Sequence, residues 1–264
     1  MFRPLRMATF LAPNVYPAYQ FIAKYVGEKL NSQVDLIVGS SFDQFERGEA
    51  DFGFICGLPF VELADRDPAP VELVAAPVLQ GKRFQGRPVY YSDVIVRSDS
   101  PFRSFEDLRG CRWSFNDRDS QSGYGITRYW LASRGENQSY FGQIVEAGFH
   151  QESIRMVCEG VVDASAIDCQ VLAVEMREKP ELASQLKLLD ALGPSSIQPV
   201  VAASHLPEEL KAGLREVFLE MGEDPAAKSP LAYGYIERFA FVEDSSYDDI
   251  REMKAVADSA GIRF

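Results

Sequence analysis

The chain has 264 residues, with 27 Lys and Arg against 39 Asp and Glu, and therefore a formal charge of −12. Nucleic acid and anionic lipid are excluded as main partners, because like charges repel. The 46% of hydrophobic and 25% of charged residues are typical of a folded globular protein and not of a disordered one. No stretch approaches the roughly 20 apolar residues of a membrane span, so no membrane insertion is expected.

Short β-rich runs alternate with amphipathic helical stretches along the whole chain, which predicts an α/β fold with mainly parallel sheets covered by helices. In chain order, the expected strands are Leu5–Leu11, Val34–Val38, Phe52–Ile55, Val71–Val78, Tyr90–Arg97, Arg112–Phe115, Ala164–Ile167, Leu186–Leu192 and Val200–Ala203. The expected helices are Tyr16–Leu30, Phe42–Arg47, a segment opening at Gly57, Ser122–Ser133, Gln151–Glu159, Cys169–Lys179, Pro207–Met221 and Tyr247–Ala260.

Two polar connections, 80–88 and 193–196, interrupt this alternation and look like the edges of a domain. The strand and helices expected after the second connection look like further elements of the domain that the first half of the chain forms. Two crossings between domains then predict a discontinuous first domain. We expect lobe 1 to contain residues 1–88 and 198–264, and lobe 2 to contain residues 89–197.

The cysteines and histidines predict no metal site. Cys56, Cys111, Cys158 and Cys169 form no C-x-x-C pair, and the two histidines lie far apart. Disulfides remain open, but single cysteines inside apolar runs such as Phe54–Cys56 are usually small buried side chains. No cofactor is expected either.

The segment Phe115–Gly125 carries the strongest functional signal. It lies between an expected strand and an expected helix, so its hydroxyls and the free N–H groups of the first helical turn converge on one point that favours an anion. Ser120 and Ser122 add donors, and Gly123 lets a ligand approach the backbone. The alternative is that Ser122 only caps its own helix, since serine is among the commonest N-caps.

Two further polar residues occupy favourable places. His150 begins another expected helix, where its imidazole could hydrogen-bond an anion, although a histidine at such a cap is more often structural. Asp168 follows a strand at a carboxyl end, where open α/β sheets bind ligands, and could instead cap the next helix. No nucleophile and base can be paired, and no phosphate-loop, dinucleotide or zinc-protease motif is present. The sequence therefore predicts no catalytic residues.

Several segments, taken in order, resemble the phosphonate/phosphite/phosphate-binding proteins of ABC importers. They are Arg47–Gly53, Tyr91–Pro101, Ser104–Gly110, Asp119–Tyr124, Gly148–His150, Val157–Ala164 and Ala166–Asp168. The resemblance as a whole takes in nearly the whole chain. The resemblance implies a two-lobed type II periplasmic-binding-protein fold, in which two α/β lobes joined by crossovers close around a ligand.

The resemblance also implies the binding residues. Ser120, Gln121, Ser122 and His150 match the positions that hold phosphoryl-type oxygens in that family. Tyr91 matches a tyrosine of the cleft. The residue expected to face the organic end of the ligand is Asp168 or Gln198.

Two positions depart from the family pattern. Gln121 stands where the family usually has another hydroxyl residue, so an oxygen contact is either lost or supplied by an amide. Phe42 stands where related phosphonate binders often carry a tyrosine, which weakens the case for an aminophosphonate ligand.

The main hypothesis is a solute-binding component of an ABC importer that captures a small oxyanion and presents it to a permease. The alternatives are a cofactor-biosynthesis type of enzyme and a ligand-sensing module on the same fold. We expect a monomer. The family implies a periplasmic or extracellular location, yet the chain opens without an export signal, which leaves the cytoplasm as the alternative.

Overall fold

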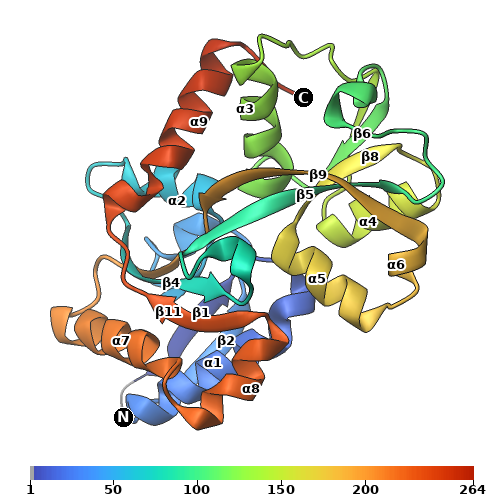
Figure 1. The fold of residues 1–264 in the computed structure, drawn as a ribbon. Coiled ribbons are helices and arrows are strands. Elements are labelled where there is room, and N and C mark those ends of the chain that lie inside the picture. The colour runs from blue at the N-terminus through green and yellow to red at the C-terminus, as the bar shows by residue number, and fades with distance from the viewer. Residues whose placement is uncertain (1–2) are drawn as a thin grey trace. The chain divides into compact units, whose positions relative to one another are not determined.

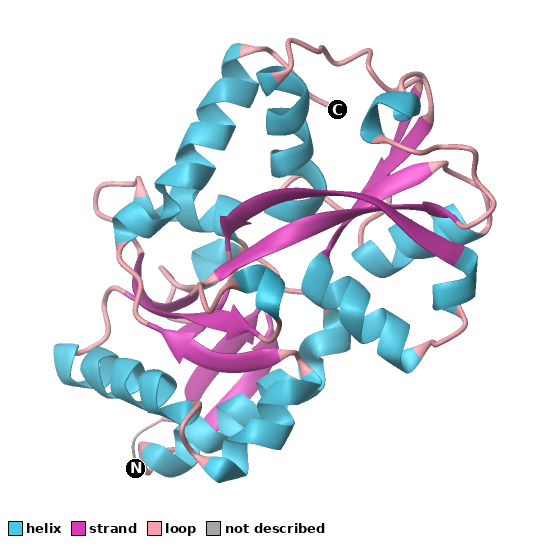
Figure 2. Ribbon diagram, viewed as in Figure 1, coloured by secondary structure: helices cyan, strands magenta, loops and turns pink. Residues whose placement is uncertain are grey.

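The computed structural model describes residues 3–264, which form two compact units. Unit 1 contains the chain up to Val89 and residues Ser196–Asp248; unit 2 contains Tyr90–Ser195 and Asp249–Phe264. The chain thus crosses between the units three times and not twice as the sequence predicted. Figure 1 traces the chain by colour, and Figure 2 shows helices and strands.

Unit 1 is a six-stranded sheet with the order β11-β4-β10-β3-β1-β2. Its strands are β1 (Leu5–Thr9), β2 (Val34–Val38), β3 (Phe52–Phe54), β4 (Val71–Leu79), β10 (Val200–Ala203) and β11 (Ile236–Ala240). Its helices are α1 (Tyr16–Lys29), α2 (Gly57–Ala64), α7 (Glu208–Met221) and α8 (Pro225–Tyr233), with short 3₁₀ turns η1 (Pro13–Val15), η2 (Phe42–Gln44), η3 (Lys82–Phe84) and η6 (Asp244–Tyr247).

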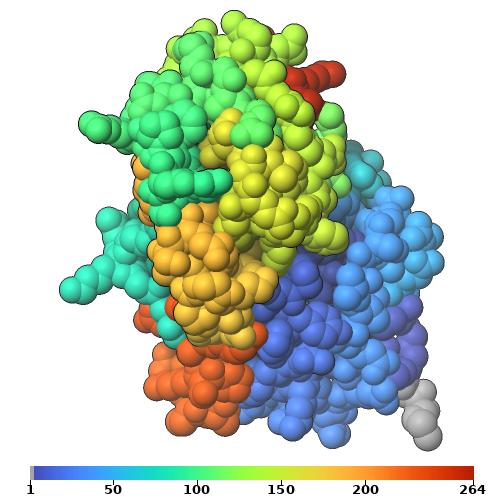
Figure 3. All heavy atoms as spheres, turned by 90° about the vertical axis from the view of Figure 1, so that its right-hand side faces the viewer, coloured from blue at the N-terminus to red at the C-terminus, as the bar shows by residue number. Residues whose placement is uncertain are grey.

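Unit 2 is a five-stranded sheet with the order β7-β6-β8-β5-β9. Its strands are β5 (Val89–Arg97), β6 (Arg112–Phe115), β7 (Gln143–Glu146), β8 (Ala164–Asp168) and β9 (Leu186–Ser196). Its helices are α3 (Ile126–Ser133), α4 (His150–Cys158), α5 (Cys169–Glu178), α6 (Leu182–Gln185) and α9 (Asp248–Ser259), with the turns η4 (Phe105–Leu108) and η5 (Gln121–Gly125). Residues of α4, α5 and α6, yellow-green to gold, cover the face of unit 2 seen in Figure 3.

Both sheets are mixed, whereas the sequence predicted mainly parallel ones. In unit 1, β1 runs parallel to β2 and β3, but β10 is antiparallel to β3 and β4, and β11 is antiparallel to β4. In unit 2, β6 is parallel to β7 and β8, while β5 is antiparallel to β8. Strands β5 and β10 each follow a crossing between the units, so they enter their sheets from the other unit and not through a right-handed helical crossover.

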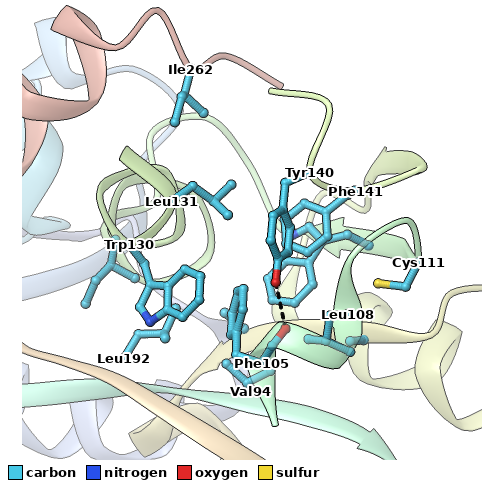
Figure 4. Close-up of a cluster of buried hydrophobic side chains, with 14 of the residues drawn as sticks. Val94, Phe105, Leu108, Cys111, Trp130, Leu131, Tyr140, Phe141, Leu192 and Ile262 are labelled. Carbon is cyan, nitrogen blue, oxygen red and sulfur yellow. Dashed lines mark hydrogen bonds between the residues drawn. The ribbon is translucent and has the colours of Figure 1, made fainter. Parts of the chain in front are cut away.

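The core of unit 2 is rich in aromatic rings. Trp113 and Phe141 stack with their ring centroids 4.5 Å apart, and Tyr140 Oη donates a 2.9 Å hydrogen bond to the carbonyl oxygen of Phe105 (Figure 4). Met253 and Ile262, from the end of the chain, are buried in the same cluster. Burying such side chains stabilises the fold by roughly 1.5–3 kcal/mol each.

The C-terminal residues 249–264 therefore belong to unit 2, whereas the sequence predicted that they belong to lobe 1. The reason is packing: the apolar face of α9 is buried through Met253 and Ala257. An amphipathic pattern reveals that a helix has such a face but not which core covers it.

Sequence analysis missed two helices and two strands: α6, α8, β7 and β11. Helix α8 begins at Pro225 and contains Pro230, residues that usually mark a loop, and Asp224 caps it through the N–H of Ala226. In the described part of the chain, the four cysteines form no disulfide. Across residues 3–264, none of the helices is both long and apolar enough to span a membrane.

Candidate anion-binding site

Three parallel strands of unit 2 end at one edge of the sheet. Strand β6 leads into the turn η5, β7 into the start of α4, and β8 into the start of α5. Carboxyl ends of parallel strands are where open α/β sheets place ligands, because helix N-termini meet there with unpaired N–H groups. The predicted residues Ser120, Gln121, Ser122, His150 and Asp168 lie in the segments that follow these strands.

The turn η5 has an unusually wide backbone. It is a π-helical turn in which the N–H of Gly125 donates to the carbonyl oxygen of Ser120 at 2.9 Å, and it continues directly into α3. Single π-helical turns are frequent at functional sites. Ser120 is the N-cap, and its Oγ accepts from the N–H of Gly123 at 3.0 Å.

Because Ser120 caps the helix, the hydroxyl of Ser122 is available for another role. Ser122 Oγ lies 3.2 Å from Ser120 Oγ and 3.0 Å from His150 Nε2. All three side chains are buried. The interpretation that Ser122 only caps its own helix is wrong, and the two helix starts do meet.

His150 is the first residue of α4 and is 6% exposed. Burial lowers the pKa of its imidazole to about 3, so the ring is neutral near pH 7. Its Nδ1 is buried and has no hydrogen-bond partner among the described residues. A buried polar atom without a partner in a native fold calls for an explanation, and a bound ligand is one.

Gly123 lies directly against the side chain of Asn116. A Cβ built at position 123 would lie 1.9 Å from Asn116 Oδ1, so a larger residue there would displace the Asn116 side chain. Asn116 is buried and its Oδ1 has no partner among the described residues, while its Nδ2 donates to Asp117 at 2.8 Å. Sequence analysis missed Asn116; the available signal was an amide residue directly after a strand.

One carboxylate lies beside the turn. Asp117 Oδ1 accepts from the N–H of Asp119 at 2.9 Å, which shapes the loop before Ser120. Burial, and then the charge of Asp119, raises the pKa of the Asp117 carboxyl to about 6. The turn itself offers neutral donors: two hydroxyls, one imidazole and backbone N–H groups. Such dipoles suit an anion without requiring a cation.

The amide nitrogen of Gln121 has two acceptors in unit 2. Its Nε2 donates to Ser195 Oγ at 3.3 Å and to the sulfur of Met253 at 3.2 Å. The amide therefore faces the end of β9 and helix α9, because two acceptors lie there.

Of the remaining expected residues in unit 2, Asp168 is the N-cap of α5. Its Oδ1 accepts from the N–H groups of Gln170 and Val171 at 2.7 and 3.3 Å. Tyr91 lies half-buried in β5, where its N–H donates to the sulfur of Cys169 at 3.5 Å. Their contact with a ligand stays a prediction.

The other two expected residues lie in unit 1. Phe42 is the first residue of η2, with its ring 4.7 Å from that of Phe10. Gln198 is buried between β9 and β10 in the chain. Sequence analysis did not single out Phe149, which directly precedes His150 and is 63% exposed.

Comparison with known proteins identifies the family of the chain. Residues 7–247 match a family described as ABC transporter, phosphonate, periplasmic substrate-binding protein. The chain is 25% identical to the phosphonates-binding periplasmic protein of Escherichia coli K12, over 96% of this chain and 74% of the relative.

Two solved structures share the fold. One is a binding-protein component of a phosphonate ABC transporter from Pseudomonas aeruginosa, with a TM-score of 0.85, 21% identity and coverage of 98% of this chain and 88% of that one. The other is a Prochlorococcus marinus protein in complex with methylphosphonate, with a TM-score of 0.80, 20% identity and coverage of 96% and 98%.

Proposed function

The chain belongs to the family of periplasmic substrate-binding proteins of phosphonate ABC transporters, and from this premise we propose that Ser120, Ser122 and His150 bind the oxygens of its ligand. The proposed ligand is a small tetrahedral oxyanion of the phosphonate, phosphite or phosphate class. The observation that carries the proposal is the 3.0 Å contact between Ser122 Oγ and His150 Nε2, which unites two helix starts at one point.

The proposed binding is reversible and needs no covalent step. An oxyanion would accept hydrogen bonds from the hydroxyls of Ser120 and Ser122 and from the first-turn N–H groups, at the positive end of the dipole of α3. His150 is neutral in the free protein, and an adjacent anion would favour its protonated form and raise its pKa. The family is one of binding proteins and not of enzymes, which favours this hypothesis over the enzyme alternative.

A permease partner and a small ligand follow from the family. The family is periplasmic, and we propose that location for this chain. The monomeric state stays a prediction that size-exclusion chromatography with light scattering tests. Closure of the two units around the ligand also stays a prediction, tested by small-angle scattering with and without methylphosphonate.

A second group of residues is proposed to contact the organic end of the ligand. We propose that Asp168 or Gln198 faces it, as the family resemblance implies, and that Tyr91 and Phe42 also bind the ligand. Alanine variants at these positions test the assignment when their affinities for methylphosphonate and for a longer aminoalkylphosphonate are compared. A contact with the organic group changes the ratio of the two affinities, whereas a structural effect lowers both.

Calorimetric titration with methylphosphonate, phosphite, phosphate and sulfate tests the proposal. Ser122→Ala should weaken the preferred ligand by roughly 1.5–3 kcal/mol, the typical value of a hydrogen bond to a charged group. Ser133→Ala is the matched control, because it removes a serine hydroxyl from the exposed other end of α3. Equal affinity of Ser122→Ala and the wild type, or no binding of any of these anions, would contradict the proposal.

A further inference from the structure

The side chain of Gln121 is buried, yet it lies outside the group formed by Ser120, Ser122 and His150. Gln121 is 1% exposed, and its amide nitrogen has two N–H donors that reach Ser195 Oγ and Met253 Sδ. A buried amide is costly without such partners, so these contacts fix where the side chain lies.

The carbonyl end of the same amide lies close to the backbone of Gly125. A Cβ built on Gly125 would lie 2.3 Å from Gln121 Oε1, so the amide oxygen lies directly over the Cα of Gly125. Gly125 has ordinary helical dihedral angles, φ −59 and ψ −51, and alanine would be excluded there only by this contact. The amide nitrogen is thus held by its two acceptors, and a Cβ at position 125 would displace the amide oxygen.

The two partners of Gln121 stand at two of the three crossings between the units. Ser195 is the last residue of unit 2 before the chain passes to Ser196, and Met253 lies in α9 just after the chain returns at Asp249. On the other side of these crossings, Ser196 Oγ donates to the carbonyl oxygen of Ser246 at 2.6 Å. One glutamine thus connects the anion-binding turn to both segments.

We propose that Gln121 is a positioning residue that holds the Ser120–Gly123 turn and couples it, through Ser195 and Met253, to the two chain crossings. This inference rests on the proposed function, because it assigns how the occupied turn communicates with the crossings. Gln121 binds no ligand oxygen with its side chain; it determines where the hydroxyls and N–H groups of the turn lie.

Hydrogen exchange measured by mass spectrometry on the full chain tests the coupling. With saturating methylphosphonate, the wild type should exchange about tenfold more slowly in 120–126, and also in 190–196 and 249–255, a change that corresponds to about one net hydrogen bond. Gln121→Met keeps the length of the side chain and removes both donors. In this variant the protection should remain in 120–126 and fall below about twofold in the two distant segments.

Three variants separate coupling from general destabilisation. Ser195→Ala removes one acceptor alone, and Gly125→Ala displaces the amide without changing it; both should reduce distant protection as Gln121→Met does. Tyr140→Phe is the control, because it deletes a buried hydrogen bond to Phe105 that involves neither the turn nor α9. It should lower stability and leave the pattern of protection unchanged.

The outcomes distinguish this inference from the proposed function. If the wild type shows no protection and no calorimetric heat with any oxyanion, the proposed function fails. In that case the inference is judged on the free protein, where Gln121→Met should speed exchange in 120–126 about tenfold. Unchanged exchange there, or full distant protection in ligand-bound Gln121→Met, overturns the inference.

Discussion

Arg128 Nε donates a 2.7 Å hydrogen bond to the carbonyl oxygen of Ile262, a residue 134 positions later in the chain. The same guanidinium donates to Asp258 Oδ1 at 2.5 Å and lies over the ring of Tyr124, 4.9 Å from its centroid. Arg128 is 5% exposed. Helix α3, which follows the turn η5, is therefore bound through Arg128 to the segment 258–262 (Figure 1).

Replacing Arg128 by methionine should lower the free energy of unfolding by about 3 kcal/mol, because breaking a buried ion pair costs roughly 3–5 kcal/mol and Asp258 is partly exposed. Urea denaturation measures the change. Lys254→Met is the control: it removes the other cation near Asp258, in a pair exposed on both sides, and should cost less than about 1 kcal/mol. Similar losses in the two variants would refute the fastening role of Arg128.

The stability of the protein should fall on acidification because of His150. Its pKa is about 3 in the folded protein and about 6.5 in the unfolded chain, so between these values only the unfolded chain binds the proton. The unfolding free energy then decreases as the pH drops through that window, by at most about 1.4 kcal/mol per pH unit.

The measurement compares urea denaturation of the wild type and His150→Gln at pH 7 and pH 5. The wild type should lose more stability between the two values than the variant does. His205→Gln is the control, since the only other histidine is exposed. If both variants follow the wild type in parallel, the buried neutral state of His150 is refuted.

Asp117 should have the opposite effect to His150 on how the unfolding free energy changes with pH. Its pKa is raised to about 6 by burial and by Asp119, so the folded protein holds a proton in a pH range where the unfolded chain has lost it. The carboxyl therefore costs stability as the pH rises from about 4 through 6. Asp117→Asn should gain stability relative to the wild type on going from pH 5 to pH 7.

The control for this pH dependence is Asp119→Asn, which removes the neighbouring charge and keeps Asp117. It should lower the pKa of Asp117 and shrink, without abolishing, the loss of stability between pH 5 and pH 7. A difference between wild type and Asp117→Asn that stays constant with pH would show that the carboxyl titrates normally.

Asp168→Ala should destabilise the protein by about 1 kcal/mol, because α5 loses the side-chain cap that accepts from Gln170 and Val171. Asp168→Ser restores a capping oxygen and should recover most of the loss in thermal or urea unfolding. If the serine variant is stable but binds an aminoalkylphosphonate more weakly than the wild type, the carboxylate has a second role at the ligand. Equal stability of the alanine variant and the wild type would argue against the cap.

The sequence predicted those elements whose residues carry a local signal. The strands Val34–Val38, Arg112–Phe115 and Val200–Ala203 have the predicted bounds, because each is a short apolar run between turn residues. The turn η5 also lies between a strand and a helix, as the sequence predicted. The family and the fold class follow from ordered motifs, and the comparisons confirm both.

What the sequence could not supply depends on contacts between distant segments. Either Ser120 or Ser122 could cap the helix by local rules, and the choice depends on the π-helical turn and on His150, which lies 28 residues away. The direction of the Gln121 side chain is decided by Ser195 and Met253, which come from the far end of the chain. No local pattern contains these partners.

The division of unit 2 into residues 90–195 and 249–264 has a consequence for biosynthesis. A ribosome releases the N-terminal part of a chain first, and domains generally fold as they emerge. Unit 1 is fully available once Asp248 has left the exit tunnel. The interior built around Trp113 and Phe141 still lacks Ile262 at that moment, so Ile262 must also leave the ribosome before the second unit can close its own core.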